Sequence, residues 1–155
     1  MKYLFLVFVL LFSACSVKNY EHTKTKIIII KSPKLKFADV GYIRNSGKSI
    51  ELELFIAGKA IEKFRINHLV CVRDGCMSKS GFNEQYLHAS YPDNILQNIL
   101  LGEVIYNGKN RVQNKEGFSQ KIRTQDVDIS YRVNSREIFF KDRKNNILFK
   151  IKDTQ

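Results

Sequence analysis

The sequence has little of the side-chain chemistry on which enzymes rely. It contains three histidines and three cysteines, and it lacks a phosphate-binding glycine loop, a nucleophile elbow and the zinc-binding helix of metalloproteases. His22 lies in a polar stretch, His68 in an apolar one, and His88 has no nucleophile or carboxylate near it in the sequence. We therefore expect a protein that is not an enzyme and that uses no cofactor.

Long apolar runs are also missing after the first twelve residues. The longest later runs, Ile27–Ile30 and Leu69–Val72, have the length of a strand and are too short to cross a bilayer. Internal repeats and low-complexity segments are absent too. This pattern indicates one globular domain with its own core.

The N-terminus differs in character from the rest of the chain. Lys2 precedes an apolar run from Leu4 to Phe12, two small residues follow, and then Cys15. The run is shorter than a membrane span, which is typical of the apolar part of a cleaved signal. The segment resembles a bacterial lipoprotein signal peptide with a lipobox at 11–15. An uncleaved anchor, or a secretion signal cut at another bond, would be the alternatives.

This resemblance implies three parts and a location. Residues 1–14 would be the signal peptide, 15–25 the lipidated Cys15 with a polar tether, and 26–155 a single folded domain. Several acyl chains on one cysteine give stable membrane anchoring, since each buried methylene adds about 0.8 kcal/mol. We expect an anchored protein of the cell envelope, in the outer membrane and facing the periplasm.

The charge balance is strongly positive, with 26 Lys and Arg against 15 Asp and Glu, a formal net charge of +11. Outside the cytoplasm, the acidic partners of such a protein are phospholipid headgroups, lipid A phosphates or other envelope polyanions rather than nucleic acid. The cations are dispersed between apolar residues, however. A basic surface that is merely solvated is therefore the alternative interpretation.

Cys71 and Cys76 form an even pair in an oxidising compartment, which favours a disulfide. A two-residue turn at Asp74 and Gly75 would place Cys71 opposite Ser78, so we expect the bond to need a four-residue loop. The alternative is a zinc site with two nitrogen and two sulfur ligands, from His68, Cys71, Cys76 and His88.

Alternating apolar and polar residues predict half-buried strands through most of the chain. The β-branched run Ile27–Ile30 predicts a strand buried on both faces. Turn signals separate the segments. The predicted strands are 27–30, 37–43, 50–56, 61–66, 68–72, 127–133, 136–142 and 147–151.

One stretch between the two strand blocks has helical spacing instead. Pro92 and Asp93 suit the start of a helix, and Gly102 suits its end. The apolar residues in between cover a wide face that should be buried. The predicted fold class is α+β, mostly antiparallel β, with a curved sheet or half-barrel wrapped around this one central apolar helix.

The stretch from Tyr91 to Glu103, together with the lipobox, the early hairpins and three C-terminal strands, resembles the LolA/LolB-like envelope lipoproteins. That resemblance implies a curved antiparallel sheet under a helical lid, with an apolar groove that receives the acyl chains of other lipoproteins. It implies that the groove is lined by Leu52, Leu54, Phe64, Ile95, Ile99, Ile129, Tyr131 and Phe149.

Three classes of function therefore remain open from the sequence. The first is an acyl-chain or lipoprotein carrier that acts in lipoprotein localisation to the outer membrane, with no covalent chemistry. The second is a structural or assembly accessory that docks an envelope protein complex. A surface adhesin would be a third. Bound lipid would distinguish the first from the other two.

Overall fold

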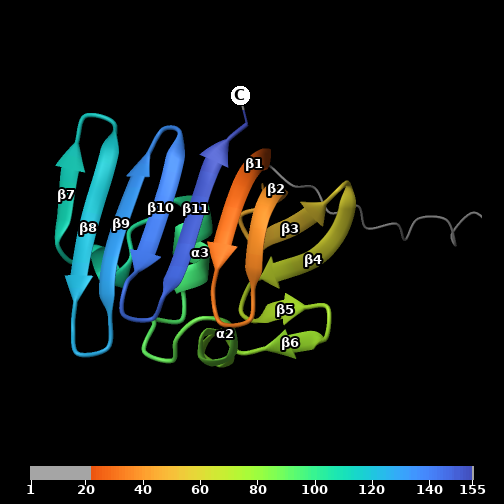
Figure 1. Ribbon diagram of the computed structural model, residues 1–155, viewed down its shortest axis with the longest axis horizontal. Coiled ribbons are helices and arrows are strands. Elements are labelled where there is room, and N and C mark those ends of the chain that lie inside the picture. The colour runs from red at the N-terminus through yellow and green to blue at the C-terminus, as the bar shows by residue number, and fades with distance from the viewer. Residues whose placement is uncertain (1–21, 155) are drawn as a thin grey trace, which may run out of the picture.

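A computed structural model describes residues 22–154, and they form mostly antiparallel sheet (Figure 1). Eleven strands hydrogen-bond in the order β6-β5-β4-β3-β2-β1-β11-β10-β9-β8-β7. The strands are β1 His22–Lys31, β2 Lys36–Asn45, β3 Ile50–Ile56, β4 Lys59–Ile66, β5 Val70–Val72, β6 Gly75–Met77, β7 Arg111–Asn114, β8 Gly117–Arg123, β9 Asp128–Asn134, β10 Glu137–Asp142 and β11 Ile147–Asp153. The helices are α2 Lys79–Tyr86, α3 Ile95–Leu101 and the short 3₁₀ helix η1 Tyr106–Gly108.

Two meanders of hairpins make up the sheet. Strands β1 to β6 form one meander and β7 to β11 the other, and the pairing of β1 with β11 joins them. In that pairing Ile28 lies opposite Ile151, and Ile30 lies opposite Phe149. The two strands that join at the centre of the sheet are thus far apart in the sequence. The two edge strands, β6 and β7, flank the segment that contains the helices.

The expected half-barrel around one helix is not what the structure shows. The sheet is open, and the predicted helix is α3, which has only seven residues and ends at Gly102 in a left-handed conformation with a φ of 69°. Such a helix is about 10 Å long, whereas eleven strands span about 50 Å. A single short helix therefore cannot cover the sheet. The helix α2 and the segment around η1 extend the layer.

The core lies between one face of the sheet and the helices. Inward positions alternate along each strand, so that Leu52 and Leu54 are buried with exposed fractions of 1% and 0%. The four apolar side chains Ile95, Leu96, Ile99 and Leu100 of α3 complete this core. The opposite face of the sheet carries most of the lysines and arginines of the strands.

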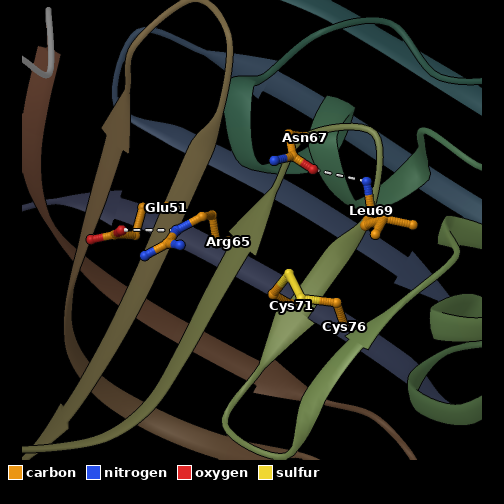
Figure 2. The surroundings of a disulfide bond; sticks show 6 residues. All are labelled: Glu51, Arg65, Asn67, Leu69, Cys71 and Cys76. Carbon is orange, nitrogen blue, oxygen red and sulfur yellow. Dashed lines mark hydrogen bonds and ion pairs between the residues drawn. A yellow bond between two sulfur atoms is a disulfide. The ribbon is translucent and has the colours of Figure 1, made fainter. Parts of the chain in front are cut away.

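One carboxylate departs from the pattern of half-buried strands, in which the polar residues that alternate with apolar ones face solvent. The side chain of Glu51 is only 3% exposed. Its carboxylate pairs with the guanidinium of Arg44 at 3.1 Å and the ammonium of Lys63 at 2.8 Å. The guanidinium of Arg65 lies 3.9 Å from the same carboxylate (Figure 2). Cations from the neighbouring strands β2 and β4 thus compensate its burial, which a single-strand pattern does not reveal.

The folded region begins earlier than the sequence indicates. His22–Thr25, expected in the tether, belong to β1, because β2 extends far enough to pair with them and places Asn45 opposite His22. The signal peptide and Cys15 lie outside the described residues. Within residues 22–154, no helix has the length and apolar character needed to cross a bilayer.

The disulfide between Cys71 and Cys76 is confirmed (Figure 2). The two cysteines lie directly opposite each other in β5 and β6, with their Cα atoms 3.9 Å apart. The expected four-residue loop is wrong, because Val72 pairs with Gly75 and only two residues make the turn. Of the side chains in the alternative zinc site, both cysteine sulfur atoms are engaged in this bond. The Nδ1 atom of His88 contacts the hydroxyl of Ser90 at 2.7 Å.

Candidate functional site

The segment 79–110, between β6 and β7, lies against the buried face of the sheet and is called the cover here (Figure 1). Its first helix, α2, was not predicted, because only Phe82 and Asn83 of its eight residues are buried and its apolar pattern is weak. The local signal for it is Ser78, whose hydroxyl accepts a hydrogen bond from the backbone N–H of Gly81 at 3.0 Å. This cap satisfies a free donor at the helix start.

Aromatic rings attach α2 to the sheet. The ring of Phe64 on β4 meets Phe82 edge-on at 5.9 Å and Tyr86 edge-on at 6.4 Å. Phe82 and Tyr86 stack on each other at 4.6 Å, one helical turn apart. At the margin, Lys34 lies over the Tyr86 ring at 5.3 Å and donates to the side-chain oxygen of Gln85 at 3.4 Å. Apolar contacts therefore dominate this attachment.

A small apolar space lies beneath α2. Its volume is about 10 Å³, which is about the least that holds one water molecule. It is lined by Ile30, Ser32, Leu35, Leu52, Phe64, Phe82, Tyr86, Leu87, Leu96 and Phe149. The seam between α2 and the sheet is thus closed in this conformation, and its walls are almost wholly apolar.

Polar side chains of the sheet hold the part of the cover that follows α3. The buried amide of Gln120 on β8 donates to the carbonyl oxygens of Ile105 and Lys109 at 2.9 and 2.8 Å, and accepts from the N–H of Ile105 at 2.9 Å. The hydroxyl of Tyr131 on β9 donates to the carbonyl of Glu103 at 2.9 Å. These bonds satisfy backbone groups that would be costly to bury unpaired.

A buried carboxylate holds the segment between the two helices. The hydroxyl of Tyr91 donates to Asp142 at 2.7 Å, and Asp142 also accepts from the side chain of Asn145 at 2.7 Å and the N–H of Asp128 at 3.1 Å. Burial alone would raise the pKa of Asp142, but these hydrogen bonds lower the pKa below its ordinary value. Burial and the bond to Asp142 raise the pKa of Tyr91.

The eight residues predicted to line a groove are all buried, with exposed fractions of 2% or less. Leu52, Phe64 and Phe149 border the space beneath α2. Tyr131 serves as a hydrogen-bonding anchor. The other four pack in the core without bordering that space; they are Leu54, Ile95, Ile99 and Ile129. The open groove itself stays a prediction.

Sequence reasoning missed the walls that α2 and the β1–β2 loop contribute. These are chiefly Phe82, Tyr86, Leu87 and Leu35. The available signal was the aromatic pair at positions 82 and 86, whose spacing of four places both rings on one side of a helix. Among residues 22–154, no group of three or more His, Cys, Asp or Glu side chains is arranged to hold a metal ion.

Comparisons of the chain with protein-family models, with curated proteins and with solved structures found no match. The functional interpretation therefore rests on the residues and their geometry.

Proposed function

We propose that the protein is a lipid-anchored envelope protein that binds an acyl chain non-covalently between α2 and the sheet. The observation that carries this proposal is the uneven attachment of the cover. Its α2 end contacts the sheet through apolar rings above a closed apolar seam, and the buried hydrogen bonds of its Asn83 amide go to the carbonyl oxygens of Tyr91 and Pro92 within the cover. Tyr91, Gln120 and Tyr131 attach the rest of the cover to the sheet by buried hydrogen bonds. An acyl chain can replace apolar contacts, but it cannot replace hydrogen bonds.

The energetics permit such an exchange. Lifting α2 would expose the apolar surface of two or three large side chains, at about 2–3 kcal/mol each. An acyl chain with about twelve methylenes in the seam would gain about 10 kcal/mol by leaving water. The gain exceeds the cost, so that the loaded state can be the stable one even though the empty seam closes.

The proposed anchor at Cys15 would keep the whole domain tethered to a membrane. Six residues lie between Cys15 and His22, the first described residue of β1, and the seven Cα–Cα steps reach at most about 25 Å. The antiparallel sheet with helices over one face matches the coarse arrangement that the resemblance to LolA/LolB-like lipoproteins implies, but the sheet is open rather than curved. The proposed cargo is therefore a lipid or the acylated end of another lipoprotein.

Titration with a fluorescent fatty acid tests the proposal on the purified full chain. We expect saturable binding that a lipopeptide displaces. Leu35→Glu places a carboxylate beside the seam at a half-buried position and should weaken binding at least tenfold. Val112→Glu, at a position on β7 that is 63% exposed, makes the same change in charge and should leave binding unchanged.

Three results would contradict acyl-chain binding: no saturable signal, no displacement by the lipopeptide, or equal losses in the two variants. Absence of binding would favour the second function class, in which the sheet docks an envelope protein. The exposed face of the sheet offers Phe139 for such contact, with the Arg132 guanidinium 4.8 Å from its ring centre.

A further inference from the structure

A second hollow lies at the opposite end of β1 from the seam. Its volume is about 330 Å³. The lining residues come from β1, β2, β10, β11 and the end of α3; they are His22, Lys24, Lys26, Ile43, Asn45, Leu100, Leu101, Glu103, Ile138 and Ile151. Ser32, beside the seam, is eight residues further along the chain than Lys24, which corresponds to about 26 Å. The two sites are therefore separate.

Basic side chains gather on one side of this hollow. His22, Lys24 and Lys26 occupy alternate positions of β1, so that all three project from the same face of the strand. Asp153 pairs with Lys26, and Glu103 is the one carboxylate among the lining residues. His22 and Lys24 remain exposed at the rim. The local field therefore favours an anion.

An adjoining hollow extends this basic rim. Its volume is about 370 Å³, and it shares Asn45, Leu101 and Glu103 with the first. It adds the ammonium groups of Lys48 and Lys79. The surroundings thus hold four lysines and one histidine against the carboxylates of Glu103 and Asp153, which is an excess of positive charge.

The floor of the first hollow is apolar. Ile43, Leu100 and Ile151 are buried beneath it, and Leu101 and Ile138 are partly buried at its sides. A free phosphate ion would gain nothing from such a floor. A glycerophospholipid would place its phosphate among the cations and its glycerol and first methylenes on the apolar residues.

We propose that this hollow binds the headgroup of an anionic phospholipid in the membrane that carries the protein. The inference rests on the proposed anchor at Cys15, which would hold His22 within about 25 Å of the bilayer. It does not depend on acyl-chain binding beneath α2. Engagement here would orient the domain with the start of β1 toward the membrane and the seam away from it.

Methyl NMR of the full chain in neutral detergent tests the site. The isoleucine and leucine methyl groups are labelled, and dihexanoyl phosphatidylglycerol is added. We expect saturable shifts at Ile138 and Leu101 and none at Ile56, which is 49% exposed on β3. Dihexanoyl phosphatidylcholine and inorganic phosphate are titrated in parallel and should bind at least tenfold more weakly.

Charge reversals locate the effect. Lys24→Glu should weaken phosphatidylglycerol binding about tenfold, since each basic residue near an anionic surface contributes about fivefold. Lys36→Glu makes the same change at the other end of the sheet, opposite Lys31, and should have no effect. Equal losses in both variants would mean diffuse attraction to a basic surface and would overturn the proposal.

The remaining outcomes also decide the question. Equal binding of inorganic phosphate would assign the hollow to a free anion, and equal binding of phosphatidylcholine would show that the cations contribute nothing; both overturn the proposal. Absence of shifts at Ile138 and Leu101 does so as well. Because the fatty-acid titration monitors the seam and these methyl groups monitor the hollow, failure of one proposal is distinguishable from failure of the other.

Discussion

The two ends of the cover are held against the same sheet by different kinds of interaction. Phe64, Phe82 and Tyr86 join α2 to the sheet through ring contacts, which are tolerant of sliding and of substitution by other apolar groups. The chain around α3 is fixed by Asp142 and Gln120, whose hydrogen bonds have specific partners and cannot shift without leaving buried polar atoms unpaired. One end of the cover is therefore suited to opening, and the other to staying in place.

Removal of Asp142 should have the largest effect on the fixed end. Asp142→Ala leaves the hydroxyl of Tyr91 and the amide of Asn145 without their acceptor in a buried place, and we expect a loss of about 3 kcal/mol in the free energy of unfolding. Urea unfolding followed by circular dichroism measures it. Asp93→Ala, at an exposed position, should change little. A loss below 1 kcal/mol for Asp142→Ala would mean that this end is not held by polar anchoring.

Gln120 should come second. Gln120→Leu keeps the volume of the side chain but removes three hydrogen bonds to the backbone of Ile105 and Lys109, and we expect a loss of about 2 kcal/mol. The same substitution at Gln113, which is exposed on β7, is the control for the chemical change itself. If both variants unfold at the same urea concentration, the amide of Gln120 is not an anchor.

Acid should loosen the fixed end through Asp142. Its folded pKa lies below the ordinary value, so its contribution to stability is complete above about pH 4 and is lost as the pH falls through the folded pKa. Between pH 6 and pH 3, the wild type should therefore lose more unfolding free energy than Asp142→Asn does. Equal losses would show that the hydrogen bonds to Asp142 do not stabilise its charged form.

The smallest effect on global stability should come from Lys34. Lys34→Ala removes the contacts with Tyr86 and Gln85 at the margin of the seam, where solvent weakens them. We expect no measurable change in urea unfolding, but faster hydrogen exchange at the backbone amides of Phe82 and Leu87 in and after α2. The amide of Asn98 in α3 should keep its exchange rate. Uniform acceleration would contradict independent opening of α2.

Individual strands and the helix α3 could be predicted from the spacing of apolar residues within each segment. The strands around Leu52 and Ile129, and the helix before Gly102, follow from local spacing. The strand order of the sheet could not be predicted, since it depends on the pairing of β1 with β11, residues more than a hundred positions apart. Local patterns contain no information on that pairing.

The candidate site was predictable only in part, for a similar reason. Leu52 and Phe64 were recognisable as apolar strand residues, but nothing in their own segments indicates that Phe82 covers them. In the sequence, Tyr131 resembles one more apolar strand residue. Its role as an anchor depends on the carbonyl of Glu103, which lies beside its hydroxyl only in the folded protein. Polar anchors of this kind are visible only in three dimensions.

A covalent lock on α2 tests the central claim most directly. Lys34 and Gln85 touch across the margin of the seam, so Lys34→Cys/Gln85→Cys can be joined by a short bismaleimide without disturbing the core. Lys121→Cys/Ser130→Cys, a facing pair on β8 and β9, is the matched control and joins two strands that need not separate. Fluorescent fatty-acid titration is run on each variant before and after cross-linking. We predict that the lock on α2 weakens binding at least tenfold, while the lock between the strands leaves it unchanged. Full binding by the protein with α2 locked would contradict the account.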